Sequence, residues 1–188
     1  MKELSLNILD VAKNSVTAGA SLITVRITET EESLTIFIGD NGCGMKEETV
    51  RNVVDPFYTT RTTRAVGLGL PLLKMEAEMT GGSMTVTSRH ESEYPEDHGT
   101  EVEATFYKNH IDYIELGDII STITILISGS PDIDWLFQHQ TPAGSVDLDT
   151  REIRAALGPE VPLDLPDVVA WMTGSLQEEY NEINYING

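Results

Sequence analysis

One short stretch, Asp40-Asn41-Gly42-Cys43-Gly44-Met45, combines a carboxylate with two closely spaced glycines. Glycine adopts backbone conformations that other residues avoid, and its missing side chain lets a flat ligand approach the main chain. A carboxylate followed by bare backbone therefore suits a heterocyclic base that offers an amino group. The same residues also fit a plain turn, because Asp and Asn side chains readily bond to their own backbone. These residues alone leave both interpretations open.

A second set of polar side chains lies near the amino terminus. Residues 3–17 have the apolar spacing of a helix, with Leu4, Ile8 and Val11 on one arc. The opposite arc carries Asn7, Asp10, Asn14 and Thr17. Exposed helix faces are usually rich in Lys and Glu, so an arc of one acid, two amides and a hydroxyl is unusual. An ordinary solvated stripe is the alternative.

A third candidate is the glycine-rich segment Gly67-Leu68-Gly69-Leu70, which is predicted to open a helix that runs to Met79. Free backbone N–H groups and the positive end of the helix dipole stabilise phosphate at such a position. Close packing explains many Gly-x-Gly pairs equally well.

The intervening elements must position these residues. Alternating apolar residues predict strands at 23–27 and 34–38, paired antiparallel, so that Asp40 stands at a strand end. A short helix is predicted at 46–53, ended by the proline that follows. Further strands are expected around 84–86 and 99–106, separated by a charged loop.

Composition narrows the class of protein. The chain has 188 residues, is 40% hydrophobic and carries a net charge of −19, which predicts a soluble globular protein. The negative charge argues against binding to nucleic acid or an anionic membrane. No signal peptide or bilayer-length apolar run is evident, so the expected location is the cytoplasm. The single cysteine, Cys43, excludes an internal disulfide and a cysteine metal cluster.

The charge is unevenly divided along the chain. Residues 1–110 carry ten basic and seventeen acidic residues, whereas residues 111–188 carry two and fourteen, for a net charge of −12. We interpret this shift as a domain boundary near residue 110.

Taken together, these segments resemble the GHKL superfamily of ATP-binding domains, which includes sensor histidine kinases, gyrase B, MutL and heat-shock chaperone ATPases. The resemblance covers about residues 1–107. It rests on the asparagine-bearing segment 10–20, the glycine boxes at 40–45 and 67–70, the phenylalanine-box-like segment 55–61 and Gly99-Thr100. It implies an α/β sandwich (α+β), with a mixed sheet covered on one face by helices and ATP held between helices and a lid.

The resemblance also implies roles for individual residues. Asp40 would accept the adenine amino group, with Gly42, Gly44, Met45 and Thr100 near the base. Asn14 would hold Mg²⁺ through its side-chain oxygen, which suits a hard cation that bridges phosphates. The glycine box would place its backbone against the phosphates, and the lid would contribute its own side chains. These further residues are Phe57, Thr60, Arg61, Arg64, Gly67, Leu68, Gly69 and Leu70.

Asp10 occupies the position at which hydrolysing members and anti-sigma serine kinases carry a general base, four residues before Asn14. An acid there could take a proton from water or from a serine or threonine hydroxyl. Three features depart from the family pattern: Thr17 replaces a lysine common in histidine kinases, Ala65 replaces a glycine, and the lid is short. No helical hairpin with a phosphorylatable histidine is present, so the chain is not expected to be a complete sensor kinase.

Residues 111–188 show no usable resemblance. The apolar run 119–127 is a strand candidate, and residues 133–138 and 145–148 are expected to form a hairpin. Thr150 is expected to cap a helix that ends at Leu157. A last helix is predicted from Pro166 to about Ile183, with its apolar stripe in the core. We expect a small acidic α+β module that docks a positively charged protein.

These observations predict an ATP- and magnesium-binding domain that acts in trans as a protein kinase or ATPase on a partner protein. The alternative is a non-catalytic nucleotide sensor, whose ATP occupancy orders the lid and changes docking.

Overall fold

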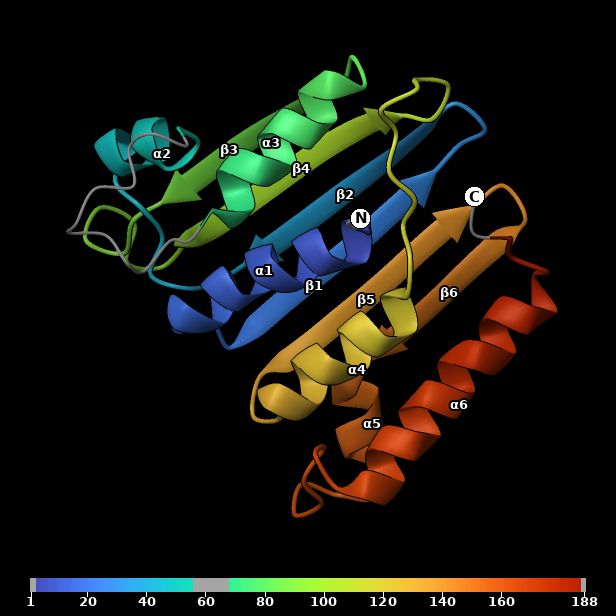
Figure 1. Cartoon of the computed structure of the whole chain (residues 1–188). Coiled ribbons are helices and arrows are strands. Elements are labelled where there is room, and N and C mark those ends of the chain that lie inside the picture. The colour runs from blue at the N-terminus through green and yellow to red at the C-terminus, as the bar shows by residue number, and fades with distance from the viewer. Residues whose placement is uncertain (1–2, 56–67, 187–188) are drawn as a thin grey trace.

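The computed structural model describes residues 3–55 and 68–186. Within those residues, six strands form one mixed sheet in the order β3-β4-β2-β1-β5-β6 (Figure 1). Neighbouring strands are antiparallel, except for the parallel pair of β1 and β5. The strands are β1 (Leu22–Glu29), β2 (Ser33–Asp40), β3 (Ser83–Arg89), β4 (Gly99–Tyr107), β5 (Asp134–Thr141) and β6 (Gly144–Asp149).

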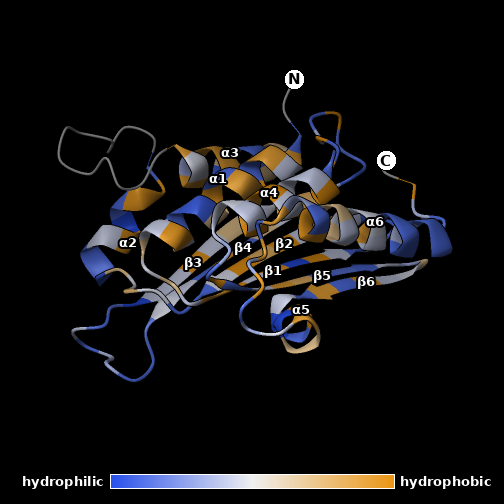
Figure 2. Ribbon diagram, turned by 90° about the horizontal axis from the view of Figure 1, so that it is seen from below, coloured by the Kyte–Doolittle hydropathy of each residue, from blue (hydrophilic) through white to orange (hydrophobic). Residues whose placement is uncertain are grey.

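Helices cover mainly one face of this sheet. The helices are α1 (Leu4–Thr17), α2 (Glu47–Val53), α3 (Gly69–Met79), α4 (Ile119–Gly129), α5 (Thr150–Leu157) and α6 (Pro166–Glu182). Figure 2 shows α1, α3, α4 and α6 on one side of the sheet and α5 on the other. The expected α+β sandwich is therefore confirmed, with α5 as an additional helix on the opposite face. No helix among the described residues combines the length and apolar character needed to cross a membrane.

The core lies between the sheet and the main helical layer. Alternate residues of each strand point toward the helices, as the period-two pattern predicts: Ile23, Val25 and Ile27 on β1 are buried, as are Leu34, Ile36 and Ile38 on β2. The predicted antiparallel pair is confirmed, with Ile23 opposite Asp40. Asp40 consequently continues the inward-facing series of β2 at the strand's carboxyl end.

The segment 119–127 corrects the sequence prediction, because it forms helix α4 and not a strand. Asp118 caps this helix by accepting a hydrogen bond from the backbone N–H of Ser121 at 3.0 Å. Buried positions recur at helical spacing, at Ile119, Ile123 and Ile127. A near-continuous apolar run has no period that separates a buried helix from a buried strand, and packing against α1 and α6 decides the outcome.

The cap of α5 also differs from the prediction. Asp149 is the N-cap residue, and its carboxylate accepts from the backbone N–H of Arg151 at 2.9 Å. The Thr150 hydroxyl instead accepts from the backbone N–H of Trp135 at 2.8 Å and is fully buried. The predicted hairpin is confirmed as β5 and β6, and the last helix as α6.

A buried polar cluster joins the two parts of the sequence. Glu29 accepts hydrogen bonds from Lys108 at 2.6 Å, His139 at 2.7 Å and Tyr185 at 2.6 Å. Burial raises the pKa of Glu29, but these three hydrogen bonds outweigh it and lower the pKa from 4.5 to about 2. Residues 1–110 and 111–188 thus share one sheet and one core. The domain boundary near residue 110 stays a prediction.

Candidate functional site

Asp40 is held from two sides at the end of β2. The Ser15 hydroxyl donates to one carboxylate oxygen at 2.6 Å, and the backbone N–H of Gly42 donates to the other at 2.9 Å. Ser15 lies on α1 and is 4% exposed. Thr100 on β4 is directly opposite Asp40, so both side chains lie on the helix-facing side of the sheet. The carboxylate is therefore fixed in position before any ligand binds.

The loop after Asp40 is tied to the end of β3. Gly44 has φ +71°, and a Cβ built there would lie 1.9 Å from the carbonyl oxygen of Arg89. The next residue, Met45, donates its backbone N–H to the Ser88 hydroxyl at 2.7 Å. Glycine is thus required at position 44 for backbone conformation and for close contact with β3. The sequence had predicted the special backbone conformation and the approach of a ligand, but not this close contact with Arg89.

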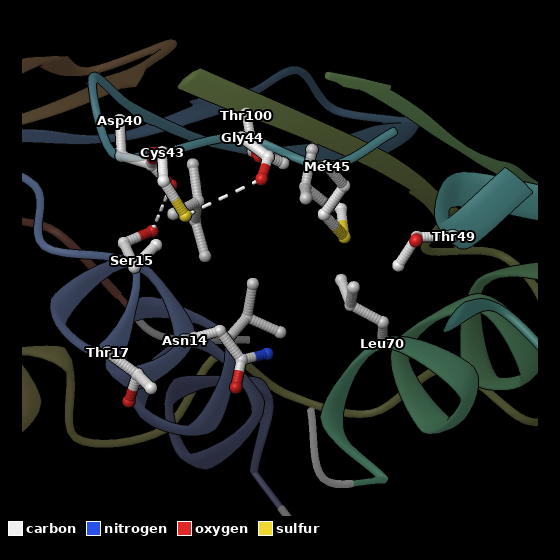
Figure 3. Close-up of a pocket in the computed structure, with 14 residues that line it drawn as sticks. Asn14, Ser15, Thr17, Asp40, Cys43, Gly44, Met45, Thr49, Leu70 and Thr100 are labelled. Carbon is white, nitrogen blue, oxygen red and sulfur yellow. Dashed lines mark hydrogen bonds between the residues drawn. The ribbon is translucent and has the colours of Figure 1, made fainter. Parts of the chain in front are cut away.

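These elements enclose a pocket of about 280 Å³. Figure 3 shows Asp40, Cys43, Gly44 and Thr100 along one side and Asn14 and Thr17 along the other. The lining residues are Val11, Asn14, Ser15, Thr17, Ala18, Ile38, Asp40, Cys43, Gly44, Met45, Thr49, Leu70, Thr100 and Val102. The apolar walls can hold a flat ring, and the few polar groups sit where they can orient it.

Six predicted site residues line the pocket together: Asn14, Asp40, Gly44, Met45, Leu70 and Thr100. Gly42 lies just outside it and acts on Asp40 through its backbone N–H. Sequence reasoning missed Ser15, Cys43 and Thr49 as lining residues. For Ser15, the available signal was its place next to Asn14 on the helix.

Asn14 has an unsatisfied amide in this pocket. Its Nδ2 atom is buried and has no hydrogen-bond partner in the described part of the chain. An unpaired buried polar group is destabilising, and native proteins seldom retain one without a reason. The group lies on the pocket wall, where a polar ligand could satisfy it.

The amino terminus of α3 lies against α1 beside Asp10. A Cβ built at Gly69 would lie 3.4 Å from the Asp10 Cβ. Leu68, the N-cap residue, is half exposed, and its side chain cannot accept a hydrogen bond. It therefore leaves the first backbone N–H groups of α3 uncapped. Asp10 itself is exposed and lies outside the set of lining residues. Phe57, Thr60, Arg61, Arg64 and Gly67 fall outside the described residues.

This fold and pocket define an α+β nucleotide-binding domain of the GHKL type. The family model of histidine kinase-, DNA gyrase B- and HSP90-like ATPases matches residues 1–110, and the chain belongs to this family. Those residues are therefore an ATP-binding domain of the kind found in histidine kinases and related ATPases.

Curated relatives and solved structures agree with this assignment. The chain is 29% identical over 87 residues to the sensor protein ChvG of Agrobacterium fabrum, covering 44% of this chain and 15% of that protein. It is 29% identical over 94 residues to the sensor protein KdpD of Clostridium acetobutylicum, covering 47% of this chain and 10% of that protein. The chain thus spans a small part of these relatives.

The fold is similar to that of the Aquifex aeolicus MutL ATPase domain complexed with ADP, at a TM-score of 0.50 and 16% identity. That match covers 80% of this chain and 66% of the MutL chain. The N-terminal domain of a DNA repair protein matches at a TM-score of 0.51 and 15% identity, covering 79% of this chain and 52% of the other. Both matches extend beyond the 110 residues of the family model, so the likeness in fold includes part of the carboxy-terminal segment.

Proposed function

We propose that this chain is an ATP- and magnesium-binding catalytic domain that acts in trans on a partner protein. It would either transfer phosphate to the partner or hydrolyse ATP to switch it. The observation that carries the proposal is the pairing of a prearranged carboxylate, Asp40, with the unsatisfied buried amide of Asn14 in one pocket. The ADP complex of the similarly folded MutL domain is consistent with this pocket as the nucleotide site.

The base would occupy the end of the pocket that is closed by β2 and β4. Asp40 would accept the adenine amino group, while Gly42 and Ser15 keep its carboxylate oriented. Thr100 stands opposite Asp40, and the walls at Gly44 and Met45 would contact the ring. Ile38 and Val102 supply apolar surface beneath it. A base with an exocyclic amino group fits these acceptors.

The residues present fit a Mg²⁺ ion that is bound mainly by phosphate oxygens and water. Within the described part of the chain, no three His, Cys, Asp or Glu side chains are grouped as a metal site. Mg²⁺ in nucleotide sites is typically held by one or two protein groups together with phosphate oxygens. The Asn14 side-chain oxygen would be one such ligand, and the cation would neutralise phosphate charge.

The phosphates would lie at the start of α3. Backbone N–H groups of Gly69 and Leu70, with Leu68 just before the helix, would face them, and the positive helix end favours negative charge. The sequence predicts further contacts from the lid and the glycine box. These predictions concern Phe57, Thr60, Arg61, Arg64 and Gly67.

Asp10 is the proposed general base. In the reaction, a water or a serine or threonine hydroxyl oxygen forms a bond to the γ-phosphorus, while the bond from phosphorus to the ADP oxygen breaks. The Asp10 carboxylate takes the proton of the attacking oxygen, a contribution of about 10²–10⁴ in rate. Its neighbour Gly69 begins the helix that would hold the phosphates, so the acid would lie beside them.

The partner would dock on the acidic carboxy-terminal segment through positive charge of its own. Helix α6 carries an exposed stripe of Asp167, Trp171, Glu178 and Glu182, in which Trp171 is 56% exposed. These positions repeat at the spacing of one helix face. Binding should weaken as salt rises if charge complementarity drives it.

The alternative proposal is a nucleotide sensor without turnover. It is favoured by the exposure of Asp10 and by its place outside the lining of the pocket. In this case ATP would change the partner's affinity without being consumed.

Calorimetry with ATP and Mg²⁺ tests the binding site. Asp40→Asn should reduce affinity by about tenfold to a hundredfold, because it exchanges a charged acceptor for an amide. Asp97→Asn, a change in an exposed loop, is the matched control. Absence of measurable ATP binding to the wild-type chain would refute the proposal.

A turnover assay separates the two functions. Phosphate release or partner labelling that disappears in Asp10→Asn, with ATP affinity retained, supports catalysis. Unchanged turnover in that variant would exclude Asp10 as the base. No turnover with any candidate partner would favour the sensor.

A further inference from the structure

Ser88 is the meeting point of three parts of the nucleotide pocket. It lies on β3 directly opposite Thr100 on β4. Its hydroxyl oxygen accepts from the backbone N–H of Met45 at 2.7 Å, lies 3.1 Å from the carbonyl oxygen of Gly99 and lies 2.7 Å from the Thr100 hydroxyl. Of these residues, Met45 and Thr100 line the pocket, whereas Ser88 is absent from the lining set. Ser88 can therefore act on a ligand only through its neighbours.

The number of available protons decides how the Thr100 hydroxyl is oriented. A serine hydroxyl has one proton to donate and two lone pairs that accept. The Gly99 carbonyl can only accept, so it takes the Ser88 proton. The two lone pairs of Ser88 then receive the Met45 N–H and the Thr100 O–H. In this arrangement each contact is a satisfied hydrogen bond, and the Thr100 proton points away from the pocket.

Both polar groups at the base end of the pocket then act as acceptors. The Asp40 carboxylate already receives hydrogen bonds from the Ser15 hydroxyl and the Gly42 backbone N–H. Thr100, its cross-strand neighbour, offers only lone pairs. Such a pair favours a base that presents an amino group and disfavours one that presents a carbonyl oxygen, because two acceptors facing each other leave both unsatisfied.

We propose that Ser88 is a positioning residue that sets nucleotide specificity by holding the Thr100 hydroxyl as an acceptor. The inference rests on the proposed nucleotide-binding function and adds to it the residue that makes the site discriminate between a 6-amino and a 6-oxo purine. Without the Ser88 oxygen, the Thr100 hydroxyl can rotate and donate to a carbonyl oxygen. Removing Ser88 should therefore improve binding of the 6-oxo nucleotide relative to ATP.

The experiment compares ATP with inosine triphosphate, which carries a carbonyl group in place of the adenine amino group. Calorimetric dissociation constants are measured with Mg²⁺ for the wild type, Ser88→Ala, Ser88→Thr, Thr100→Val and the double variant of Ser88→Ala with Thr100→Val. Thr87→Ala, at the adjacent exposed position of β3, is the control. We expect the preference for ATP to fall about tenfold in Ser88→Ala, the size of one lost discriminating hydrogen bond. Ser88→Thr should restore it, and Thr87→Ala should leave it unchanged.

The outcomes separate this inference from the proposed function. If the wild type binds neither nucleotide, the proposed function itself fails. If ATP binds but Ser88→Ala weakens the binding of ATP and inosine triphosphate by the same factor, Ser88 only anchors the loop at Met45. The inference is then overturned.

The double variant supplies a further check. If Ser88 acts through Thr100, the effect of Ser88→Ala on the ATP preference should vanish in the Thr100→Val background. Equal effects in both backgrounds would overturn the inference. If Ser88→Ala fails to fold, Thr100→Val provides the test, because this variant keeps the hydrogen bond between Ser88 and Met45. Thr100→Val should lower the preference for ATP. An unchanged preference would overturn the inference.

Discussion

Ser15 on α1 donates a hydrogen bond of 2.6 Å to Asp40 at the end of β2. The contact joins the asparagine-bearing helix to the strand that presents the carboxylate, and the serine is almost fully buried. One hydroxyl therefore couples the two walls of the pocket. This coupling, the unsatisfied Asn14 amide, the close contact at Gly44 and the Glu29 cluster lead to direct tests.

Ser15→Ala should lower both stability and nucleotide affinity. Loss of the hydroxyl leaves a partly buried carboxylate with one partner fewer, at a cost of about 1–3 kcal/mol in unfolding free energy. Urea unfolding and ATP calorimetry measure the two effects. Ser145→Ala on β6 is an exposed control. Unchanged ATP affinity in Ser15→Ala would show that the hydrogen bond does not orient Asp40.

Asn14→Ala should separate ligand binding from stability. The Asn14 Nδ2 atom has no partner among residues 3–55 and 68–186, so its removal should leave the unfolding free energy unchanged or raise it. The gain in ATP affinity on adding Mg²⁺ should disappear, as calorimetry with Mg²⁺ and with EDTA would show. Thr17→Ala on the same wall should keep that gain. A stability loss in Asn14→Ala comparable to that of Ser15→Ala would count against the orphaned amide as a ligand group.

Gly44→Ala should destabilise the protein more than Gly19→Ala. Both glycines have a positive φ, of +71° and +76°, so both substitutions add the strain of a left-handed conformation, about 1–2 kcal/mol. Only at Gly44 would the new Cβ meet the Arg89 carbonyl, at 1.9 Å, whereas Gly19 has nothing within 4 Å. The difference between the two melting temperatures isolates the contact. Equal losses of stability in the two variants would mean that the contact between Gly44 and Arg89 does not restrict the side chain at position 44.

The Glu29 cluster should give the protein an acid-sensitive component of stability. The folded-state pKa of about 2 lies below the ordinary value of 4.5, so this stabilisation is fully present above pH 4.5 and is lost as pH falls toward 2. The difference corresponds to about 3 kcal/mol. Urea unfolding between pH 7 and pH 3 should show a smaller pH dependence in Glu29→Gln than in the wild type. The exposed Glu31→Gln should show the same pH dependence of stability as the wild type. If Glu29→Gln also showed that pH dependence, Glu29 would not be the source of the acid-sensitive stability.

Local pattern explains the parts of the site that could be predicted from the sequence. The alternation of Leu34, Ile36 and Ile38 determines which face of β2 is buried, and therefore where Asp40 points. The helical spacing of residues 4–17 and the glycines of the loop are equally local signals. The residue pair Asp40 and Asn14 was accordingly predicted, and the structure brings both into one pocket.

Contacts between distant segments had no such signal. The run 119–127 lacks a period, so only packing against α1 and α6 makes it a helix. The parallel pairing of β1 with β5, the Ser88 hydrogen bonds and the meeting of Glu29 with His139 and Tyr185 each join residues far apart in the chain. Side-chain period is set by local backbone geometry and can be read in order along the sequence. Which hydroxyl meets which carboxylate depends on how the completed layers pack, and that was decided by the tertiary structure alone.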